Sequence, residues 1–254
     1  MSLPGVTWKN INVKGKSLMK KGTLYGIGVG PGDPDLITVK AVRVLNNVAV
    51  IFSATSTKNA YSLAADIVSS HLKKETPIVL LGFPMTYNKD KLSIAWEENA
   101  RKVIDSVTKG LDVACITLGD PMTYSTFGYL MRTIKEKDPD IRIKIIPGIT
   151  SYQAASASVG QVLVEGDESL TIVSGAPGAK KLKDIIDHSD NIIMVKVYHH
   201  YKEIIRTLDE LNLTSKATLV SHSGLDGEEI VHDLKKNIDK IPPYLSILLI
   251  RKKD

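Results

Sequence analysis

Short apolar runs alternate with helix-patterned segments over residues 24–146, and this alternation strongly restricts the fold. The apolar runs predict strands at residues 24–29, 48–53, 78–81, 113–118 and 141–146. Apolar residues at helical spacing predict helices near residues 35–45, 61–71, 96–108 and 127–134. Strands joined by helix-length connections pair in parallel. We therefore expect a mainly parallel α/β sheet in which residues 113–118 form the central buried strand.

The pattern changes after Pro147 and Gly148. An alanine- and serine-rich helix is expected at residues 150–159, capped by Thr150 or Ser151. Further strands are expected at residues 170–174, 191–197 and 217–221, with helices near residues 179–187 and 201–211. The last two apolar runs, 229–234 and 244–251, are joined without a helix, which predicts that they pair antiparallel. This half is expected to contain a mixed sheet.

A chain of 254 residues is long enough for two modest domains. We place a boundary near Pro147, which gives an N-terminal α/β domain at residues 23–147 and a C-terminal α/β domain at residues 148–254. A ligand-binding cleft is expected between them. Residues 1–22 are expected to form a disordered leader, because they are rich in lysine and poor in apolar residues.

The net charge of +5 comes from that leader alone. The leader contains five lysines and no acid, so residues 23–254 hold 28 basic and 28 acidic residues. This body lacks the basic excess of a nucleic-acid-binding domain, and we expect no nucleic-acid partner. A non-catalytic nucleic-acid binder that uses the leader is the alternative from another class. Deleting residues 1–22 would abolish its salt-sensitive binding but leave an enzyme active.

Several classes of protein and site are disfavoured by what the chain lacks. No apolar run reaches the roughly 20 residues that span a bilayer, and the first 22 residues lack a secretory signal. Cys115 is the only cysteine, and its place in an apolar run predicts a buried side chain rather than a nucleophile. His199 and His200 are adjacent without a set of cysteine or acidic ligands, so no metal is expected. We expect a cytoplasmic protein without membrane contact.

Three glycine-containing turns follow predicted strands. They are Gly28-Val29-Gly30-Pro31-Gly32-Asp33-Pro34, Leu118-Gly119-Asp120-Pro121 and Ile146-Pro147-Gly148-Ile149-Thr150-Ser151. The first lacks the G-x-G-x-x-G spacing of dinucleotide-binding proteins, and Asp33 and Asp35 would oppose a pyrophosphate. The next strand ends in Phe52-Ser53-Ala54 instead of a ribose-binding acid. The alternative without a ligand is a tight turn with Asp35 as a helix cap.

Small hydroxyl side chains cluster after the second turn, at Thr123, Ser125 and Thr126. A type I turn accounts for the Asp and Pro of that turn, but a helix cap needs only one hydroxyl. Hydroxyls and free amides at a strand end suit a polar ligand that is uncharged or cationic. The third turn, with Thr150 and Ser151, fits a capped helix and ligand access equally well.

Taken together, the three turns resemble those of the S-adenosylmethionine-dependent tetrapyrrole methyltransferases of cobalamin and sirohaem biosynthesis. The resemblance covers residues 23–252, with the turns in family order and near-family spacing. Met122-Thr123-Tyr124-Ser125-Thr126-Phe127 resembles the branch that methylates C-20 of precorrin-2 or cobalt-factor II, as does Phe83-Pro84-Met85. The continuations of the uroporphyrinogen and C-11 branches are absent, and Ser125-Thr126-Phe127 departs from the diphthine synthase branch.

The resemblance implies that S-adenosylmethionine lies folded between the two domains and that the enzyme is a homodimer. The cofactor-binding residues that it implies are Pro31, Gly119, Asp120, Thr123, Ser125, Thr126, Thr150, Ser151, Gly175, Ala176 and Leu245. No catalytic residue is assigned, although Asp120 and Tyr124 are candidates, and Met85 and Tyr124 are candidates for the substrate side. The substrate carboxylates should require basic groups such as Arg132 or Lys196, between which the sequence offers no choice.

The implied reaction transfers a methyl group to C-20 of precorrin-2 or cobalt-precorrin-2. A meso carbon of the reduced tetrapyrrole attacks the sulfonium methyl in line, so alignment and desolvation supply most of the acceleration. The alternatives are another branch of the family that acts at a different ring position and a non-tetrapyrrole acceptor. A third reading, an NAD-dependent enzyme, would be excluded by calorimetry that detects S-adenosylmethionine binding and no NAD binding.

Overall fold

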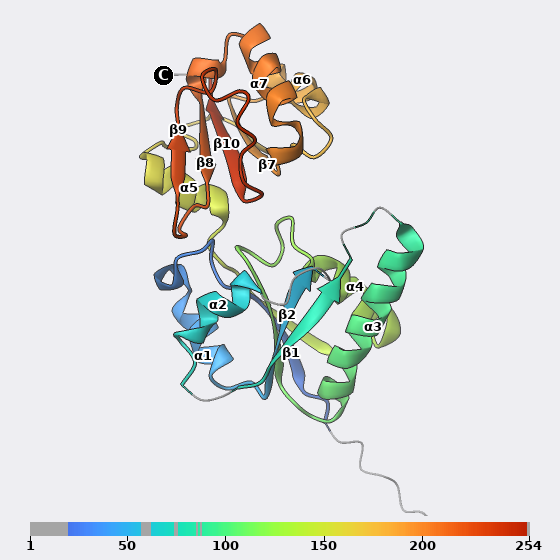
Figure 1. Ribbon diagram of the computed structural model, residues 1–254. Helices are drawn as coiled ribbons and strands as arrows, with labels where there is room; N and C mark the ends of the chain where they lie inside the picture. Colours follow the sequence, from blue (N-terminus) through green and yellow to red (C-terminus); the bar gives the residue numbers. More distant parts are fainter. Residues whose placement is uncertain (1–19, 57–61, 74–75, 85, 87, 253–254) are drawn as a thin grey trace, which may run out of the picture.

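The computed structural model describes residues 20–56, 62–73, 76–84, 86 and 88–252. It contains two five-stranded sheets, and the units built around them lie end to end along the molecule (Figure 1). Most of the leader lies outside the described residues. The domain boundary near Pro147 stays a prediction; the last strand of the first sheet ends at Ile146, and the next helix begins at Ser151.

The first sheet consists of β1 (Thr23–Gly28), β2 (Val50–Ser56), β3 (Ile78–Phe83), β4 (Val113–Thr117) and β5 (Arg142–Ile146). Its strand order is β3-β2-β4-β1-β5, and every pairing is parallel, as predicted. β4 is the central strand, and all its residues but the last are buried. Because the strands are parallel, the carboxyl ends of β4, β1 and β5 lie side by side at one edge.

Helices cover both faces of the first sheet. They are α1 (Val39–Leu45) and α2 (Leu63–Ser69) on one face, and α3 (Lys89–Thr108) and α4 (Phe127–Lys137) on the other (Figure 1). Ile116 of β4 belongs to the core cluster under α1 and α2, whereas Cys115 belongs to the cluster under α3 and α4. Successive side chains of a strand point to opposite faces, so a strand covered on both sides is apolar throughout.

The helix predicted at residues 35–45 is broken. A 3-10 turn at Pro34–Leu36 is followed by extended residues, and α1 begins only at Val39. Asp33 Oδ1 accepts a hydrogen bond from Asp35 N at 2.9 Å, so Asp33 caps the short turn. Thr38 Oγ1 accepts a hydrogen bond from the backbone of α1 and is the cap of that helix. The alternative role of Asp35 as a helix cap is therefore wrong.

The second sheet consists of β6 (Leu170–Ser174), β7 (Asn191–Val195), β8 (Ala217–Ser221), β9 (Glu229–Val231) and β10 (Ser246–Arg251). Its order is β6-β7-β10-β8-β9, with β6 parallel to β7 and every other pairing antiparallel, so the sheet is mixed, as predicted. The prediction that the last two apolar runs pair with each other is wrong. β10 inserts between β7 and β8, and β9 pairs with β8 at the edge.

The helices of this half also cover both faces of its sheet. α6 (Lys180–Ile185) and α7 (Tyr201–Glu210) pack in one core cluster with Met194 and Leu248. α5 (Ser151–Val159) packs on the opposite face through Ala155, which contacts Leu249 and its neighbours. Thr150 precedes α5 as the predicted N-cap, in a capping box with Gln153. Ala155 of α5 thus serves packing within its own half.

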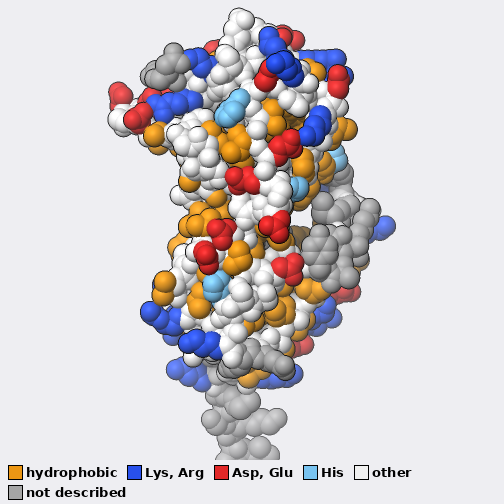
Figure 2. All heavy atoms as spheres, turned by 60° about the vertical axis from the view of Figure 1, so that its left-hand side comes forward, with side chains coloured by type: hydrophobic (Ala, Val, Ile, Leu, Met, Phe, Trp, Pro, Cys, Tyr) orange, Lys and Arg blue, Asp and Glu red, His pale blue; other side chains and the backbone are white. Residues whose placement is uncertain are grey.

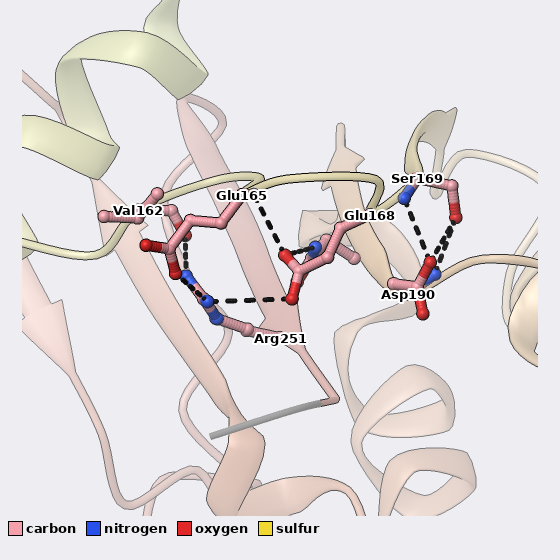
Figure 3. Close-up of polar contacts among 7 residues, drawn as sticks. Val162, Glu165, Glu168, Ser169, Asp190 and Arg251 are labelled. Carbon is pink, nitrogen blue, oxygen red and sulfur yellow. Dashed lines mark hydrogen bonds and ion pairs between the residues drawn. The ribbon is translucent and has the colours of Figure 1, made fainter.

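A polar network holds the connection between α5 and β6 (Figure 3). Arg251, at the end of β10, donates a hydrogen bond to the carbonyl oxygen of Val162 at 2.8 Å and pairs with Glu165. The hydrogen bond that Arg251 donates to the Glu165 carboxylate raises the pKa of the guanidinium. Ser169 donates to the carboxylate of Asp190 at 2.9 Å. The connection is therefore held to the end of β10 and to the residue that precedes β7.

Candidate active site

The turns that follow β1, β4 and β5 meet at one edge of the first sheet. A Cβ atom on Gly148 would lie 2.2 Å from the carbonyl oxygen of Gly119, and a Cβ atom on Gly28 would lie 2.4 Å from the same oxygen. A Cβ atom does not approach an atom of a residue distant in the sequence this closely. Glycine at these two positions therefore allows the three turns to come together.

Gly30 and Gly119 join the first two turns through their backbones. The N–H of Gly119 donates to the carbonyl oxygen of Gly30 at 2.7 Å, and the reverse hydrogen bond is 3.4 Å long. Both residues have positive φ, at 91° for Gly30 and 68° for Gly119. Side chains disfavour that region, so this backbone platform depends on glycine.

Asp120 links the second turn to the third. Its Oδ1 accepts a hydrogen bond from Met122 N at 2.8 Å, and its Oδ2 accepts one from Gly148 N at 3.1 Å. The Thr123 hydroxyl lies 3.5 Å from Oδ1. Asp120 therefore organises the edge of the sheet through backbone groups, and its oxygens keep lone pairs for a ligand.

The hydroxyl cluster after Asp120 opens α4. Ser125 Oγ accepts a hydrogen bond from Phe127 N at 3.1 Å and lies 3.0 Å from Thr117 Oγ1. Ser125 thus satisfies one backbone donor at the start of the helix. Thr126 precedes α4 without a side-chain hydrogen bond to its backbone.

A cavity of about 620 Å³ lies beside these turns and is lined by both halves of the chain. Nine of the eleven implied cofactor residues line it: Pro31, Gly119, Asp120, Thr123, Ser125, Thr126, Thr150, Ser151 and Leu245. Tyr124 also lines the cavity. Apolar walls with a few convergent polar groups are typical of small-molecule sites.

Gly175 and Ala176 lie outside the cavity lining. Gly175 N donates to the carbonyl oxygen of Val195 at 2.7 Å, and Ala176 N donates to Ser174 Oγ at 3.3 Å. These contacts belong to the turn after β6. Met85 lies outside the described residues.

The family model of the tetrapyrrole (corrin/porphyrin) methylases matches residues 23–239. This match covers the first sheet, all three turns and every strand of the second sheet except β10. The chain belongs to the tetrapyrrole methylase family.

Two relatives of this methylase match it over almost their whole length. The cobalt-precorrin-2 C(20)-methyltransferase of Salmonella typhimurium is 32% identical over 91% of this chain and 97% of its own. The protein of Methanocaldococcus jannaschii described as a probable cobalt-precorrin-2 C(20)-methyltransferase is 36% identical over 92% of this chain and 97% of its own. A branch assignment can therefore draw on more than nine-tenths of the chain.

A solved structure of the family has the same fold. The uroporphyrin-III C-methyltransferase of Thermus thermophilus, complexed with S-adenosyl homocysteine, superposes with a TM-score of 0.66. It is 20% identical in sequence, and the match covers 90% of this chain and 97% of that one. The predicted α/β fold with two sheets is therefore confirmed.

Sequence reasoning missed most of the cavity wall that the second half of this methylase supplies. The missed lining residues of that half are Tyr152, Val195, His222, Ser223, Leu225, Tyr244, Ser246 and Ile247. Ser223 is 7% exposed, and its hydroxyl has no hydrogen-bond partner within the described residues. No motif marks these positions, because they come from strand ends that are far apart in the sequence.

The two halves of the methylase touch directly beside the cavity. The Tyr124 hydroxyl donates to the carbonyl oxygen of Ile172 at 3.2 Å, which ties the loop before α4 to β6. A Cβ atom on Gly32 would lie 2.5 Å from Leu225 Cγ and 2.8 Å from the carbonyl oxygen of Gly224. Close backbone approach therefore joins the first turn to the turn after β8.

The cysteine and the adjacent histidines that the sequence singled out make ordinary packing and polar contacts. Cys115 is buried, and desolvation raises the pKa of its thiol. His200 Nδ1 lies 3.2 Å from Glu203 Oε2, and the His199 ring packs on Tyr198. Across the described part of the chain, no group of three or more histidine, cysteine or acidic residues is arranged for a metal ion. None of the helices in those residues is long and apolar enough to cross a membrane.

Charge is unevenly distributed on the surface. On the face drawn in Figure 2, acidic and apolar side chains lie around the middle, and most lysine and arginine side chains lie toward the two ends. A nucleic-acid-binding surface would place its basic groups in one patch or stripe. That face of the methylase has no such arrangement.

Proposed function

We propose that this protein transfers the methyl group of S-adenosylmethionine to C-20 of precorrin-2 or cobalt-precorrin-2 in cobalamin biosynthesis. The observation that carries this proposal is the 32% and 36% identity to cobalt-precorrin-2 C(20)-methyltransferases, over more than nine-tenths of each chain. The related structure that contains S-adenosyl homocysteine supports the choice of cofactor. The homodimer and the cytoplasmic location stay predictions.

The described residues fit S-adenosylmethionine as the methyl donor. A cavity of about 620 Å³ has the size of a small-molecule site. Gly119 of its wall packs against Gly28 and Gly148, where a side chain would strike the Gly119 backbone. The unpartnered hydroxyl of Ser223 lies in the same wall. The residues that would hold the cofactor are Pro31, Gly119, Asp120, Thr123, Ser125, Thr126, Thr150, Ser151 and Leu245.

When bound, S-adenosylmethionine supplies an electrophilic methyl group next to a sulfonium. The protein has to hold that group in line with the attacking carbon and exclude water, because alignment can supply a large part of the barrier reduction. Asp120 is the one carboxylate among the described residues that line the cavity, and the hydrogen bonds it accepts from Met122 N and Gly148 N hold it in place. It is suited to favour a cation nearby. We assign no general base.

Other branches of the family remain the nearest alternative, with methylation at a different ring position. A non-tetrapyrrole acceptor is the more distant one. Both alternatives keep the same cofactor site, so cofactor binding cannot separate them from C-20 methylation. The position of the transferred methyl group separates all three.

The test is to incubate the protein with S-adenosylmethionine labelled with ¹³C in its methyl group and with metal-free or cobalt-loaded precorrin-2. Carbon NMR of the product should show the label at C-20, and the faster of the two reactions identifies the form of the substrate. Label at another ring carbon would refute the branch assignment. Absence of transfer to either tetrapyrrole, with S-adenosylmethionine bound, would favour a different acceptor.

A further inference from the structure

A lysine and a tyrosine from opposite halves of the chain face each other at the cavity. Tyr124 lies in the loop between β4 and α4, and Lys196 directly follows β7. Both line the cavity, and Lys196 Nζ lies 5.6 Å from the centre of the Tyr124 ring. A cation at this distance is attracted to the face of the ring. The ring therefore favours a position of the ammonium next to the cavity.

Both residues have an unusual backbone conformation. Their φ angles are positive, at 49° for Tyr124 and 59° for Lys196. Four non-glycine residues in the described part of the chain have positive φ, and Tyr124, Lys196 and His222 all line the cavity. Side chains larger than those of glycine, asparagine or aspartate rarely adopt this region, and such strain gathers at ligand sites.

Lys196 has no carboxylate partner among the described residues. Several other lysines of the chain do, for example Lys21 with Asp138 at 2.6 Å and Lys240 with Glu229 at 2.6 Å. Asp120, the carboxylate in the cavity wall, accepts hydrogen bonds from backbone groups instead. The Lys196 ammonium can therefore receive an anion that enters the cavity.

The burial of the cavity wall separates two regions. Pro31 and Gly119 are buried, whereas Lys196 is exposed and Tyr124 is 50% exposed. A compact cofactor fits the buried end, and a large macrocycle has to lie at the open end. Lys196 would also repel the sulfonium and ammonium groups of S-adenosylmethionine.

We propose that Lys196 binds a carboxylate of the tetrapyrrole substrate and that Tyr124 holds its ammonium in position. This inference rests on the proposed function and adds to it a substrate-binding residue. Arg132, the other basic residue considered from the sequence, stacks on Tyr129 with 4.7 Å between its Cζ and the ring centre and lies outside the cavity lining. The structure therefore favours Lys196 over Arg132.

The test uses Lys196→Met, which removes the charge at similar length, and Lys196→Arg, which keeps the charge. Lys144→Met is the matched control, because Lys144 Nζ also lies 5.6 Å from a tyrosine ring, that of Tyr25, but outside the cavity lining. The measurements are KM and kcat for precorrin-2, its Kd in the presence of S-adenosyl homocysteine, and the Kd of S-adenosylmethionine.

Lys196→Met should raise KM and the tetrapyrrole Kd about tenfold, since a charge-assisted hydrogen bond is lost. The values of kcat and of the S-adenosylmethionine Kd should change less than about twofold, because no contact to the cofactor is removed. Lys196→Arg should restore most of the affinity, and Lys144→Met should resemble the unmodified protein. Higher salt should weaken tetrapyrrole binding more in the unmodified protein than in Lys196→Met.

Two results would overturn the inference. If Lys196→Met weakens S-adenosylmethionine binding and leaves the tetrapyrrole Kd unchanged, Lys196 binds the cofactor carboxylate. If neither Kd changes, Lys196 binds neither ligand. The Kd measurement needs no turnover, so it distinguishes this inference from the proposed function. Tetrapyrrole binding that depends on Lys196 without label at C-20 would leave the inference standing and refute the assigned reaction.

Discussion

At the scale of single residues, glycines decide the shape of the candidate site. Gly28 and Gly148 leave room for the carbonyl oxygen of Gly119, which lies 2.4 Å and 2.2 Å from the positions of their missing Cβ atoms. Asp120 then fixes the same edge by accepting a hydrogen bond from Gly148 N at 3.1 Å. The cofactor site therefore depends on an absence of side chains as much as on the polar groups that remain.

Gly148→Ala should damage this site directly. The new methyl group would overlap backbone, which cannot rotate away, so the second and third turns have to separate. We expect the Kd of S-adenosylmethionine to rise at least about tenfold and the free energy of unfolding to fall by roughly 1–3 kcal/mol. Isothermal calorimetry and denaturant unfolding measure the two effects.

Gly128→Ala is the matched control for this substitution. Gly128 lies in α4, and the nearest atom to its missing Cβ is 3.9 Å away, in the flexible side chain of Arg132. Alanine is the better helix former by up to about 1 kcal/mol, so this variant should bind S-adenosylmethionine normally and be slightly more stable. Equal cofactor affinity in the two variants would show that the glycine contact at Gly148 does not shape the site.

At the scale of elements, the sequence predicted which segments are strands more reliably than which strands pair. Apolar runs and helical spacing are local properties, so all ten strands lie at or within a few residues of their predicted places. Which strands pair with β10 depends on residues far apart in the sequence. Because β10 pairs with β7 and β8, β9 lies at the edge of the sheet instead of beside β10. α3 begins at Lys89, earlier than expected, because its cap at Asn88 is followed by a polar turn without apolar spacing.

Leu248→Ala tests the central position of β10. Leu248 is fully buried and lies opposite Met194 of β7 and Leu219 of β8. Its truncation should cost about 2–5 kcal/mol of unfolding free energy, through lost burial and the cavity left behind. Ile230→Ala, in the edge strand β9, is the comparison and should cost clearly less, because Ile230 is only partly buried. Denaturant midpoints measured by circular dichroism give both values, and a smaller loss for Leu248→Ala would contradict the strand order.

At the scale of the whole molecule, the cavity depends on how the two halves meet. The first-half residues could be predicted, because Gly119, Asp120 and the hydroxyls after them form one continuous motif. His222 and Tyr244 could not, and Lys196 could not be chosen over Arg132, because these residues lie at the ends of different strands or loops and only the folded sheet brings them together. The direct contact between the halves at Gly32 and Leu225 had no local signal either.

Gly32→Ala should therefore impair the cavity without harming either core. Its methyl group would lie 2.5 Å from Leu225 Cγ and 2.8 Å from the Gly224 carbonyl oxygen, so the first turn and the turn after β8 have to move apart. Pro31 and Leu225 both line the cavity, and we expect the Kd of S-adenosylmethionine to rise about tenfold by calorimetry. Adding Leu225→Ala removes the first overlap but leaves the second, so the double variant should recover only part of the affinity lost in Gly32→Ala. Normal cofactor binding by Gly32→Ala alone would mean that the halves do not need this contact to form the site.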